Sequence, residues 1–279
     1  MIRKTHVFSI SMLLLLASVP VVFAQSDLGS QLAELASLKD RIKDPDTRTR
    51  VDAFHRVWSI AIASDNADAK LMALDLIREP VASASDHIRI PAVYAIVEIA
   101  NRSTDPKVKR TAIASLREPM IAAQLPIRAA AIDAINSIIC SSESSDVALE
   151  ALQLLGGPVR SGNNGVRIPA INAVIHAVEH ASDDRAANAA LDMLTAPLDS
   201  MAMIGGMEVR LMAVVAVERI GVNAIDVATK AKAMGMMQLY AGKSLWEPEA
   251  KKRAAEAAAR IQASMNKKPK APPPSTQST

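Results

Sequence analysis

Apolar side chains return at a fixed step of 39 residues through most of this 279-residue chain. Two apolar columns are Leu74, Ile113, Leu152 and Leu191, and Ile77, Leu116, Leu155 and Leu194. A proline column has the same step, at Pro80, Pro119, Pro158 and Pro197. Columns that stay in step over four units indicate an internal repeat.

A column of arginines shares this step. Its members are Arg50, Arg89, Arg128 and Arg167, and it resumes at Arg210 after a four-residue insertion near residues 201–206. An alanine follows three residues after each of them, at Ala53, Ala92, Ala131, Ala170 and Ala213. The arginines therefore belong to the repeat and are not scattered surface charges.

Each unit contains two stretches whose apolar residues have helical spacing. The first, the proline helix, is predicted to end at the proline column. The second, the arginine helix, has Pro91 and Pro169 near its start, where a helix tolerates proline. One helix pair cannot bury its apolar stripe alone, whereas stacked pairs can. The sequence predicts an all-α fold, an α-solenoid or superhelix of about six antiparallel helix pairs over residues 25–265.

The arginine helices carry a family resemblance. Residues 86–96, DHIRIPAVYAI, and residues 165–174, GVRIPAINAV, resemble HEAT-type repeats, in which Val-Arg is followed by Ala three residues later. Residues 105–109, DPKVK, resemble the turn that opens such repeats. The resemblance implies a solenoid with a concave groove that holds proteins or peptides, although some relatives bind nucleic acid and others are lyases acting on pigments. The proline column departs from the common pattern, so no subfamily is assigned.

Both ends of the chain differ from the repeats. Arg3 and Lys4 precede an apolar run that ends at Phe23, which predicts a signal peptide over residues 1–24, cleaved after Ala24. An uncleaved membrane anchor is the alternative, but the run is short and Pro20 interrupts it. We therefore expect a secreted or periplasmic protein without stable membrane insertion after cleavage. Residues 266–279, rich in lysine and proline, are predicted to be a disordered tail.

Charge and cysteine content exclude several classes of function. The chain has 32 Lys and Arg against 29 Asp and Glu, and five of the cations lie in the leader and tail. The repeats are thus near neutral, which argues against a nucleic-acid partner. Cys140 is the lone cysteine, so an intrachain disulfide and a zinc site built on several thiolates are excluded.

No catalytic constellation stands out, so the chain is predicted not to be an enzyme and to need no cofactor. His176 and His180 flank Glu179 with the spacing of a zinc-protease motif, but polar residues at the equivalent repeat positions favour a solvated helix face. Cys140 has no histidine near it in sequence and is interpreted as an inert thiol. Residues 156–165 are glycine-rich but lack the Lys-Ser/Thr ending of a phosphate loop, so a turn is expected.

Two sets of residues are candidates for partner contact. The arginine column is either structural, with each guanidinium bonded to a helix end or a nearby aspartate, or a stripe for an acidic partner. The second set is apolar and comprises Met201 and Met203 at the insertion, Tyr94, and Trp246. These residues either fill the core and cap its ends or form exposed binding anchors.

The sequence favours an exported, non-enzymatic scaffold that binds a protein or peptide along the solenoid groove. Two alternatives stay open. One is a small-ligand or enzymatic role at the groove or at the methionine-rich insertion. The other is a structural cell-envelope protein whose tail contacts wall polymer. The pattern leaves the partner's identity and the oligomeric state open.

Overall fold

The computed structural model describes residues 28–82, 86–122, 124–181, 183–199, 206–243 and 246–266. These residues form helices and no strand. The predicted signal peptide, Met201, Met203 and the tail beyond Asn266 lie outside the described residues.

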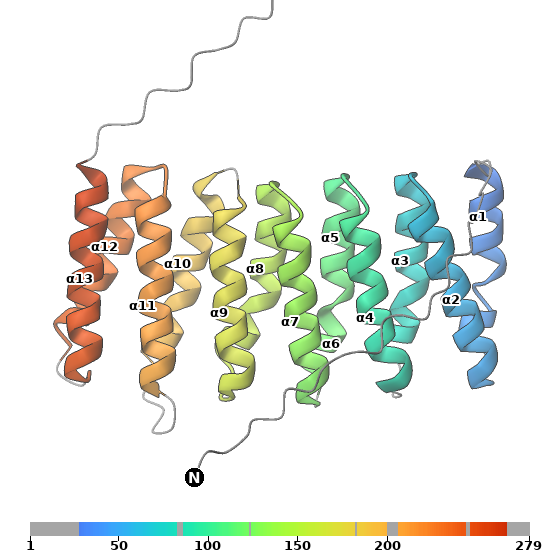
Figure 1. Cartoon of the computed structure of the whole chain (residues 1–279), viewed down its shortest axis with the longest axis horizontal. Coiled ribbons are helices and arrows are strands. Elements are labelled where there is room, and N and C mark those ends of the chain that lie inside the picture. Colours follow the sequence, from blue (N-terminus) through green and yellow to red (C-terminus); the bar gives the residue numbers. More distant parts are fainter. Residues whose placement is uncertain are drawn as a thin grey trace, which may run out of the picture.

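Six antiparallel helix pairs stand side by side in the described chain and build two layers (Figure 1). The arginine layer consists of α2 (Thr47–Ala63), α4 (Asp86–Asn101), α7 (Leu125–Cys140), α9 (Asn164–Glu179), α11 (Gly206–Asn223) and α13 (Pro248–Met265). The proline layer consists of α1 (Leu28–Ser37), α3 (Ala67–Ala82), α5 (Pro106–Ser115), α6 (Arg117–Ile121), α8 (Ser145–Val159), α10 (Asp184–Leu198) and α12 (Val227–Ala241). A short 3-10 helix, η1 (Arg41–Lys43), lies between α1 and α2. The predicted solenoid of about six pairs is confirmed.

One continuous apolar core runs between the two layers. The apolar columns of the repeat supply it, since Leu74, Ile77 and their equivalents in the next three units are buried. The alanine column is buried as well, at Ala53, Ala92, Ala131, Ala170 and Ala213. A small side chain at this position lets neighbouring helices approach closely, which explains why the core needs few aromatic residues.

The proline column lies inside the last turns of the proline helices. Pro80, Pro158 and Pro197 are each followed by one or two more helical residues, so the prediction that the helices end at these prolines was wrong. A proline removes one hydrogen bond, to the carbonyl four residues earlier, and the last turn tolerates that loss. Pro119 has the stronger effect, because its helix is interrupted at Leu116, between α5 and α6.

The prolines near the start of arginine helices also lie deeper than expected. Pro91 and Pro169 are the sixth residues of α4 and α9. Each helix continues through its proline, since only one carbonyl of the first turn loses its partner.

Aromatic side chains close the end of the core at α12 and α13. Tyr240 stands in the last unit where the earlier units carry the proline column, and its ring stacks on Trp246 with 5.0 Å between centroids. Trp246 is 7% exposed, so its interpretation as an exposed anchor is wrong and it caps the core. Burial and a hydrogen bond with Asp199 raise the pKa of the Tyr240 hydroxyl, so it stays protonated.

Candidate functional site

The arginine column points into the stack. Arg167 and Arg210 are each only 7% exposed, and Arg50, Arg89 and Arg128 are half-buried. The guanidinium groups of Arg167 and Arg210 cannot form part of a stripe that binds an acidic partner, because their burial keeps a ligand from reaching them. A contribution of the other three to binding stays a prediction.

Two arginines of the column form contacts that link neighbouring units. Arg210 forms an ion pair with Glu247, the residue before α13. Arg89 Nη1 lies 3.5 Å from Oε1 of Gln124, the residue before α7. Each guanidinium therefore reaches the start of the next helix in the arginine layer and helps to fix the register between neighbouring units.

A chain of polar contacts, which we call the polar ladder, crosses the outer face of the arginine layer. Its links are Trp58 Nε1 to Glu98 Oε2 (3.1 Å), Asn101 Nδ2 to Ser137 Oγ (2.9 Å), His176 Nδ1 to Asn136 Oδ1 (2.6 Å), Arg219 Nη2 to Glu179 Oε1 (2.7 Å) and Arg260 Nε to Glu218 Oε1 (3.2 Å). Each pair of neighbouring helices in the arginine layer, from α2 to α13, is joined by at least one such contact. The ladder thus braces this face against sliding of one unit past the next.

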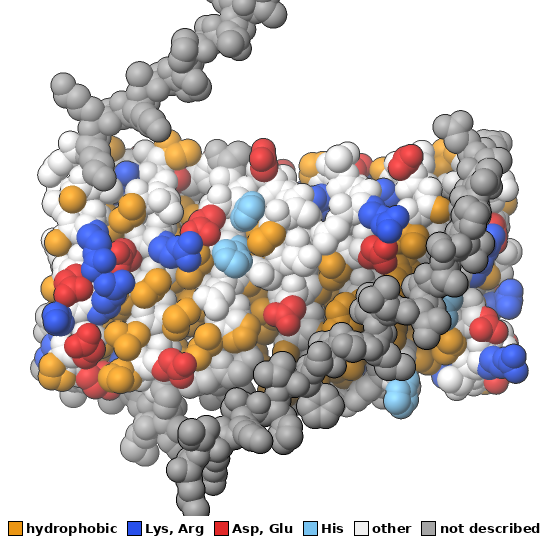
Figure 2. Space-filling model, in the orientation of Figure 1, with side chains coloured by type: hydrophobic (Ala, Val, Ile, Leu, Met, Phe, Trp, Pro, Cys, Tyr) orange, Lys and Arg blue, Asp and Glu red, His pale blue; other side chains and the backbone are white. Residues whose placement is uncertain are grey.

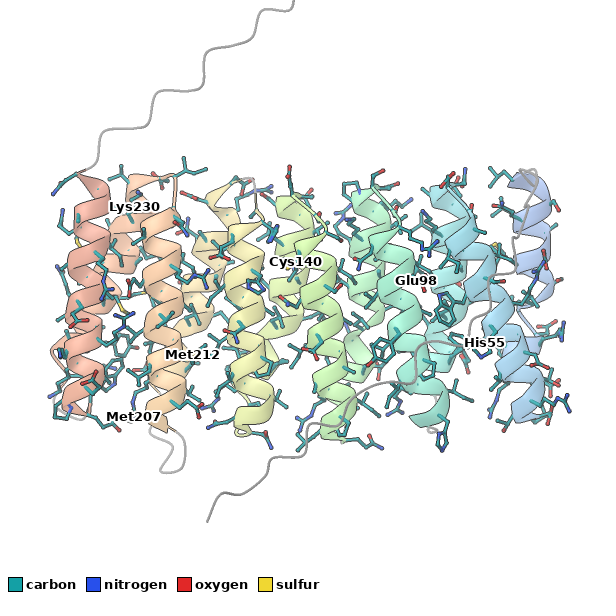
Figure 3. The ribbon with its side chains drawn as sticks, viewed as in Figure 1. His55, Glu98, Cys140, Met207, Met212 and Lys230 are labelled. Atoms are coloured by element: carbon teal, nitrogen blue, oxygen red, sulfur yellow. The ribbon has the colours of Figure 1, made fainter. Side chains whose placement is uncertain are left out.

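Cys140 is the last residue of α7, where Figure 3 labels it, and a histidine is its neighbour. Its Sγ is 4.0 Å from Nδ1 of His176, and the same nitrogen is 2.6 Å from Asn136 Oδ1. Sequence reasoning missed this histidine because it lies one helix away, on α9. Burial and the nearby Glu179 carboxylate raise the pKa of the Cys140 thiol, which keeps it protonated and weakly nucleophilic.

Below the ladder a strip of apolar side chains, which we call the apolar band, crosses the first two turns of four helices, with the exposed carboxylates of Asp133 on α7 and Glu208 on α11 beside it. Its members are Ile90 and Pro91 on α4, Leu125, Ala129 and Ala130 on α7, Ile168 and Pro169 on α9, and Met207, Leu211 and Met212 on α11. All are half-exposed or exposed. Figure 2 shows hydrophobic side chains gathered across this part of the face, and Figure 3 labels Met207 and Met212 at its α11 end.

Charged residues mark both ends of the apolar band. The positions that hold Ile90 and Pro91 on α4 hold Val51 and Asp52 on α2, and Lys252 and Arg253 on α13. The band therefore spans the four inner units and stops at the two terminal ones, where polar outer residues are typical of capping repeats.

Tyr94 stands at the upper edge of the apolar band. It is 59% exposed, one of the most exposed large hydrophobic side chains of the described chain. This exposure fits the anchor role predicted for it. Of the methionines at and just after the insertion, Met207 is exposed and Met212 is half-buried against the core, whereas the candidates Met201 and Met203 lie outside the described residues.

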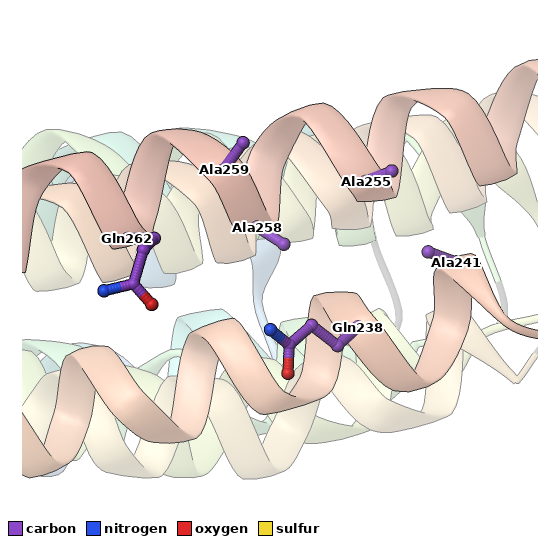
Figure 4. Close-up of a pocket in the computed structure, with 6 residues that line it drawn as sticks. All are labelled: Gln238, Ala241, Ala255, Ala258, Ala259 and Gln262. Atoms are coloured by element: carbon purple, nitrogen blue, oxygen red, sulfur yellow. The ribbon is translucent and has the colours of Figure 1, made fainter.

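A shallow depression of 420 Å³ lies at the end of the stack between α12 and α13 (Figure 4). Its lining consists of Ala241, Ala255, Ala258, Ala259, Gln238 and Gln262. The position of Ala255 holds Val214 on α11 and Phe54 on α2, both buried. Alanine thus replaces a larger apolar side chain at this position of the last described unit, which leaves the depression at that end of the described stack.

No group of three or more His, Cys, Asp or Glu side chains in the described part of the chain is placed to hold a metal ion. Among the helices described, none is both long and apolar enough to span a bilayer.

The chain is similar in fold to HEAT-like and armadillo repeat proteins. It is 15% identical to the archaeal HEAT-like repeats protein from Thermococcus onnurineus NA1, with a TM-score of 0.48 over 84% of this chain and 91% of that one. It is 21% identical to a designed armadillo repeat protein solved in complex with the peptide (KR)4, with a TM-score of 0.48 over 85% of this chain and 99% of that one. Computationally designed armadillo repeat proteins for modular peptide recognition give 20% identity and a TM-score of 0.47, over 84% and 99% of the respective chains. No family model and no curated protein matches the chain.

Proposed function

We propose that this chain is an exported, non-enzymatic scaffold that binds a protein or peptide across the outer face of its arginine layer. The observation that carries the proposal is the apolar band, a strip of apolar side chains over four helices of a preformed frame. Exposed apolar patches rimmed by polar residues mark interaction surfaces in soluble proteins. The polar ladder forms such a rim along one side.

The proposal of export is based on the predicted signal peptide at residues 1–24. The proposal that the chain is not an enzyme is based on the chemistry of the Cys140 thiol. Cys140 is the strongest candidate nucleophile of the described chain, but its raised thiol pKa opposes thiolate formation. Asn136 and Cys140 also face the same nitrogen of His176, whereas a catalytic imidazole is oriented through one nitrogen and accepts a proton on the other. A binding role therefore agrees better with these contacts than an enzymatic one.

Photo-crosslinking in the cells that produce the protein tests the proposal. A benzoylphenylalanine replaces Tyr94 at the band in one variant and Leu239, 63% exposed on α12 of the proline layer, in a matched control. The expected result is one protein crosslinked from position 94 and not from position 239. Its loss in an Ile90→Lys variant assigns the contact to the band. Equal labelling from both positions, or none from position 94, overturns the proposal.

The same assay separates the two interpretations of the arginine column. Arg89→Glu and Arg128→Glu change half-buried guanidinium groups that lie beside the band in the same helices. If the crosslink survives both changes in a folded protein, the arginines are structural. If it disappears while the thermal unfolding midpoint stays unchanged, they contact the partner.

A further inference from the structure

Two exposed apolar side chains stand at the edge of the stack where the arginine helices begin, the lower edge in Figure 1. Ile121, the last residue of α6, is 72% exposed, and Leu125, the first residue of α7, is 43% exposed. The sequence between them, Ala-Ala-Gln, carries no charge. We call Ile121 and Leu125 the α6–α7 tip.

The repeat itself does not require an apolar residue at this tip. The position of Ile121 holds Ala82, Arg160 and Asp199 in three other units, and all of these residues are exposed. A column that serves the core keeps its apolar character and is buried, as Leu116 is. Ile121 therefore adds nothing to the packing of the solenoid, and its apolar surface is available for contact with another body.

Two exposed arginines lie beside the tip. Arg117 precedes Ile121 by four residues on α6, a spacing that places both side chains on one face of the helix. Arg160 follows α8, which packs against α6. Neither guanidinium forms an ion pair with another described residue. Glu118 is the one carboxylate of α6, so the cations at the tip outnumber the anions.

Gly156 on α8 brings the two guanidinium groups to the same level. This glycine occupies the position that Arg117 holds on α6. A Cβ there would lie 3.5 Å from Nη2 of Arg160, so the Arg160 side chain folds back over the glycine. The two cations thus stand at corresponding places on neighbouring elements of the proline layer.

The opposite edge of the stack provides a contrast. Ile225 and Val227 are 77% and 62% exposed there, just before and at the start of α12. Asp226 lies between them, and the carboxylate of Asp184 accepts a hydrogen bond from the Ile225 amide at 3.1 Å. Apolar exposure at this second edge is therefore combined with negative charge, whereas at the α6–α7 tip it is combined with positive charge.

Apolar side chains between cations suit an anionic lipid surface. The apolar groups leave water for the boundary between headgroups and acyl chains, and arginines bind phosphate groups through charge-assisted hydrogen bonds. A protein partner would need a pocket shaped to the projecting Ile121, whereas a bilayer adapts to it. We infer that the α6–α7 tip docks the protein peripherally on a membrane that contains anionic phospholipids, with Ile121 and Leu125 in the interface and Arg117 and Arg160 on the lipid phosphates.

Co-sedimentation with lipid vesicles tests the inference on the protein purified from the cells that produce it. Vesicles of phosphatidylglycerol and phosphatidylcholine in equal parts supply the anionic surface, and vesicles of phosphatidylcholine alone are the neutral control. Binding to the anionic vesicles should be tighter by about tenfold or more and should weaken as salt is added. Equal binding to both kinds of vesicle, or binding to neither, overturns the inference.

Variants separate the apolar and charged parts of the tip. Ile121→Ser should weaken binding to anionic vesicles by about fivefold or more, and Arg117→Glu and Arg160→Glu by about tenfold each, with unchanged thermal unfolding midpoints. Glu118→Gln should strengthen binding. Ile225→Ser, the same change at the opposite edge, is the matched control and should have no effect. If Ile121→Ser binds as the wild type does while the charge reversals abolish binding, the site takes an acidic protein segment and the inference fails.

The three lysines of the tail are the main competitor for an anionic surface. Replacement of Lys267, Lys268 and Lys270 by glutamine should leave the effects of the tip variants in place. If this triple variant loses vesicle binding while the tip variants keep it, the tail is the docking element and the inference is overturned.

A fluorophore at the tip reports whether it enters the bilayer. A nitrobenzoxadiazole group attached to Ile121→Cys, in a Cys140→Ser background, should shift its emission to shorter wavelength on anionic vesicles, and the same group on Ile225→Cys should not. Retained vesicle binding without a shift at position 121 overturns the inference. The inference does not depend on the proposed function, since Ile121 lies outside the apolar band. A protein crosslinked from position 94 without vesicle binding refutes membrane docking alone.

Discussion

The guanidinium of Arg210 on α11 forms an ion pair with the carboxylate of Glu247, the residue that precedes α13. Arg210 is buried, and a side chain at Gly206 would lie 3.3 Å from its Nη1, so glycine leaves this guanidinium room. The pair joins the last two units of the arginine layer. Breaking it should therefore weaken the attachment of the terminal cap.

The pair predicts an acid-sensitive contribution to stability. A hydrogen bond from its own backbone amide and the charge of Arg210 lower the pKa of Glu247 below its ordinary value of 4.5. The folded state then binds this proton less readily than the unfolded state. The contribution is complete above pH 4.5 and is lost as the pH falls through the folded pKa. Urea unfolding of the wild type and Glu247→Gln should differ above pH 4.5 and converge in acid.

Glu249→Gln is the matched control, since Glu249 is exposed two residues away in the first turn of α13. Its stability should follow the wild type at every pH. Arg210→Met should lower the free energy of unfolding, because it removes the cation that pairs with Glu247. If Glu247→Gln in the Arg210→Met background costs as much as in the wild type, the pair is not coupled.

A buried lysine should stabilise the joint between α5 and α7. Lys109 Nζ donates to the backbone carbonyl of Ser141 and, at 2.9 Å, to its Oγ, just beyond the C-terminus of α7. A cation at a helix C-terminus is stabilised by the unpaired carbonyls. Lys109→Met should lower the free energy of unfolding by about 1–2 kcal/mol. Lys107→Met, on the exposed side of α5, should change it by less than about 0.5 kcal/mol in the same calorimetric measurement.

The pH dependence of the Lys109 effect has the same sign as that of Glu247, because both pKa values are lower in the folded state, but it falls in the alkaline range. Burial lowers the pKa of Lys109 from 10.5, so in the window just below pH 10.5 the folded state binds fewer protons than the unfolded state. The free energy of unfolding therefore increases as the pH rises through this window. The wild type should gain stability relative to Lys109→Met there, and a constant difference would contradict the assignment.

The helix pairs could be predicted because the apolar residues that form them recur with a single period of 39 residues. Leu74 and Ile77 recur at 39 residues as apolar, buried positions, and the solenoid follows from stacking them. The apolar band was not predicted. Its members vary from proline to methionine, and a half-exposed position can be recognised only once the buried side of each helix is known.

The polar ladder could not be predicted for a different reason. One of its positions holds Glu98, Ser137, His176 and Arg219 in successive units, so the residue type changes at every step. Their partners lie on the next helix, and the pairing depends on side-chain reach rather than on sequence spacing. Trp246 was ambiguous because an aromatic residue near a chain end can be a cap or an anchor. Burial against Tyr240 decided between the two.

Two glycines in neighbouring helices should respond oppositely to the same substitution. A Cβ on Gly221 of α11 would lie 2.7 Å from Ala233 Cβ and 2.8 Å from Ile261 Cδ1. Gly221→Ala should therefore lower the unfolding free energy by about 1–3 kcal/mol through overpacking. Gly235, within α12, has nothing within 4 Å, so Gly235→Ala should raise it by about 0.5–1 kcal/mol, the helix propensity difference. Stabilisation by both changes would show that α11 and α12 pack less closely than described.

Cys140 offers a direct measurement of the electrostatics in the polar ladder. Burial and the Glu179 carboxylate raise its thiol pKa above 9.0, and only the thiolate reacts with iodoacetamide. The alkylation rate of the folded chain should therefore reach half its maximum above pH 9.0, and Glu179→Gln should move this midpoint to lower pH. Unfolding in urea should abolish the difference between the two proteins, because the unfolded thiol no longer lies near residue 179. Asp146→Gln, an exposed change on α8, is the control and should leave the midpoint unchanged. A wild-type midpoint below 9.0 would mean that the surroundings stabilise the Cys140 thiolate, and the argument against a catalytic cysteine would then fail.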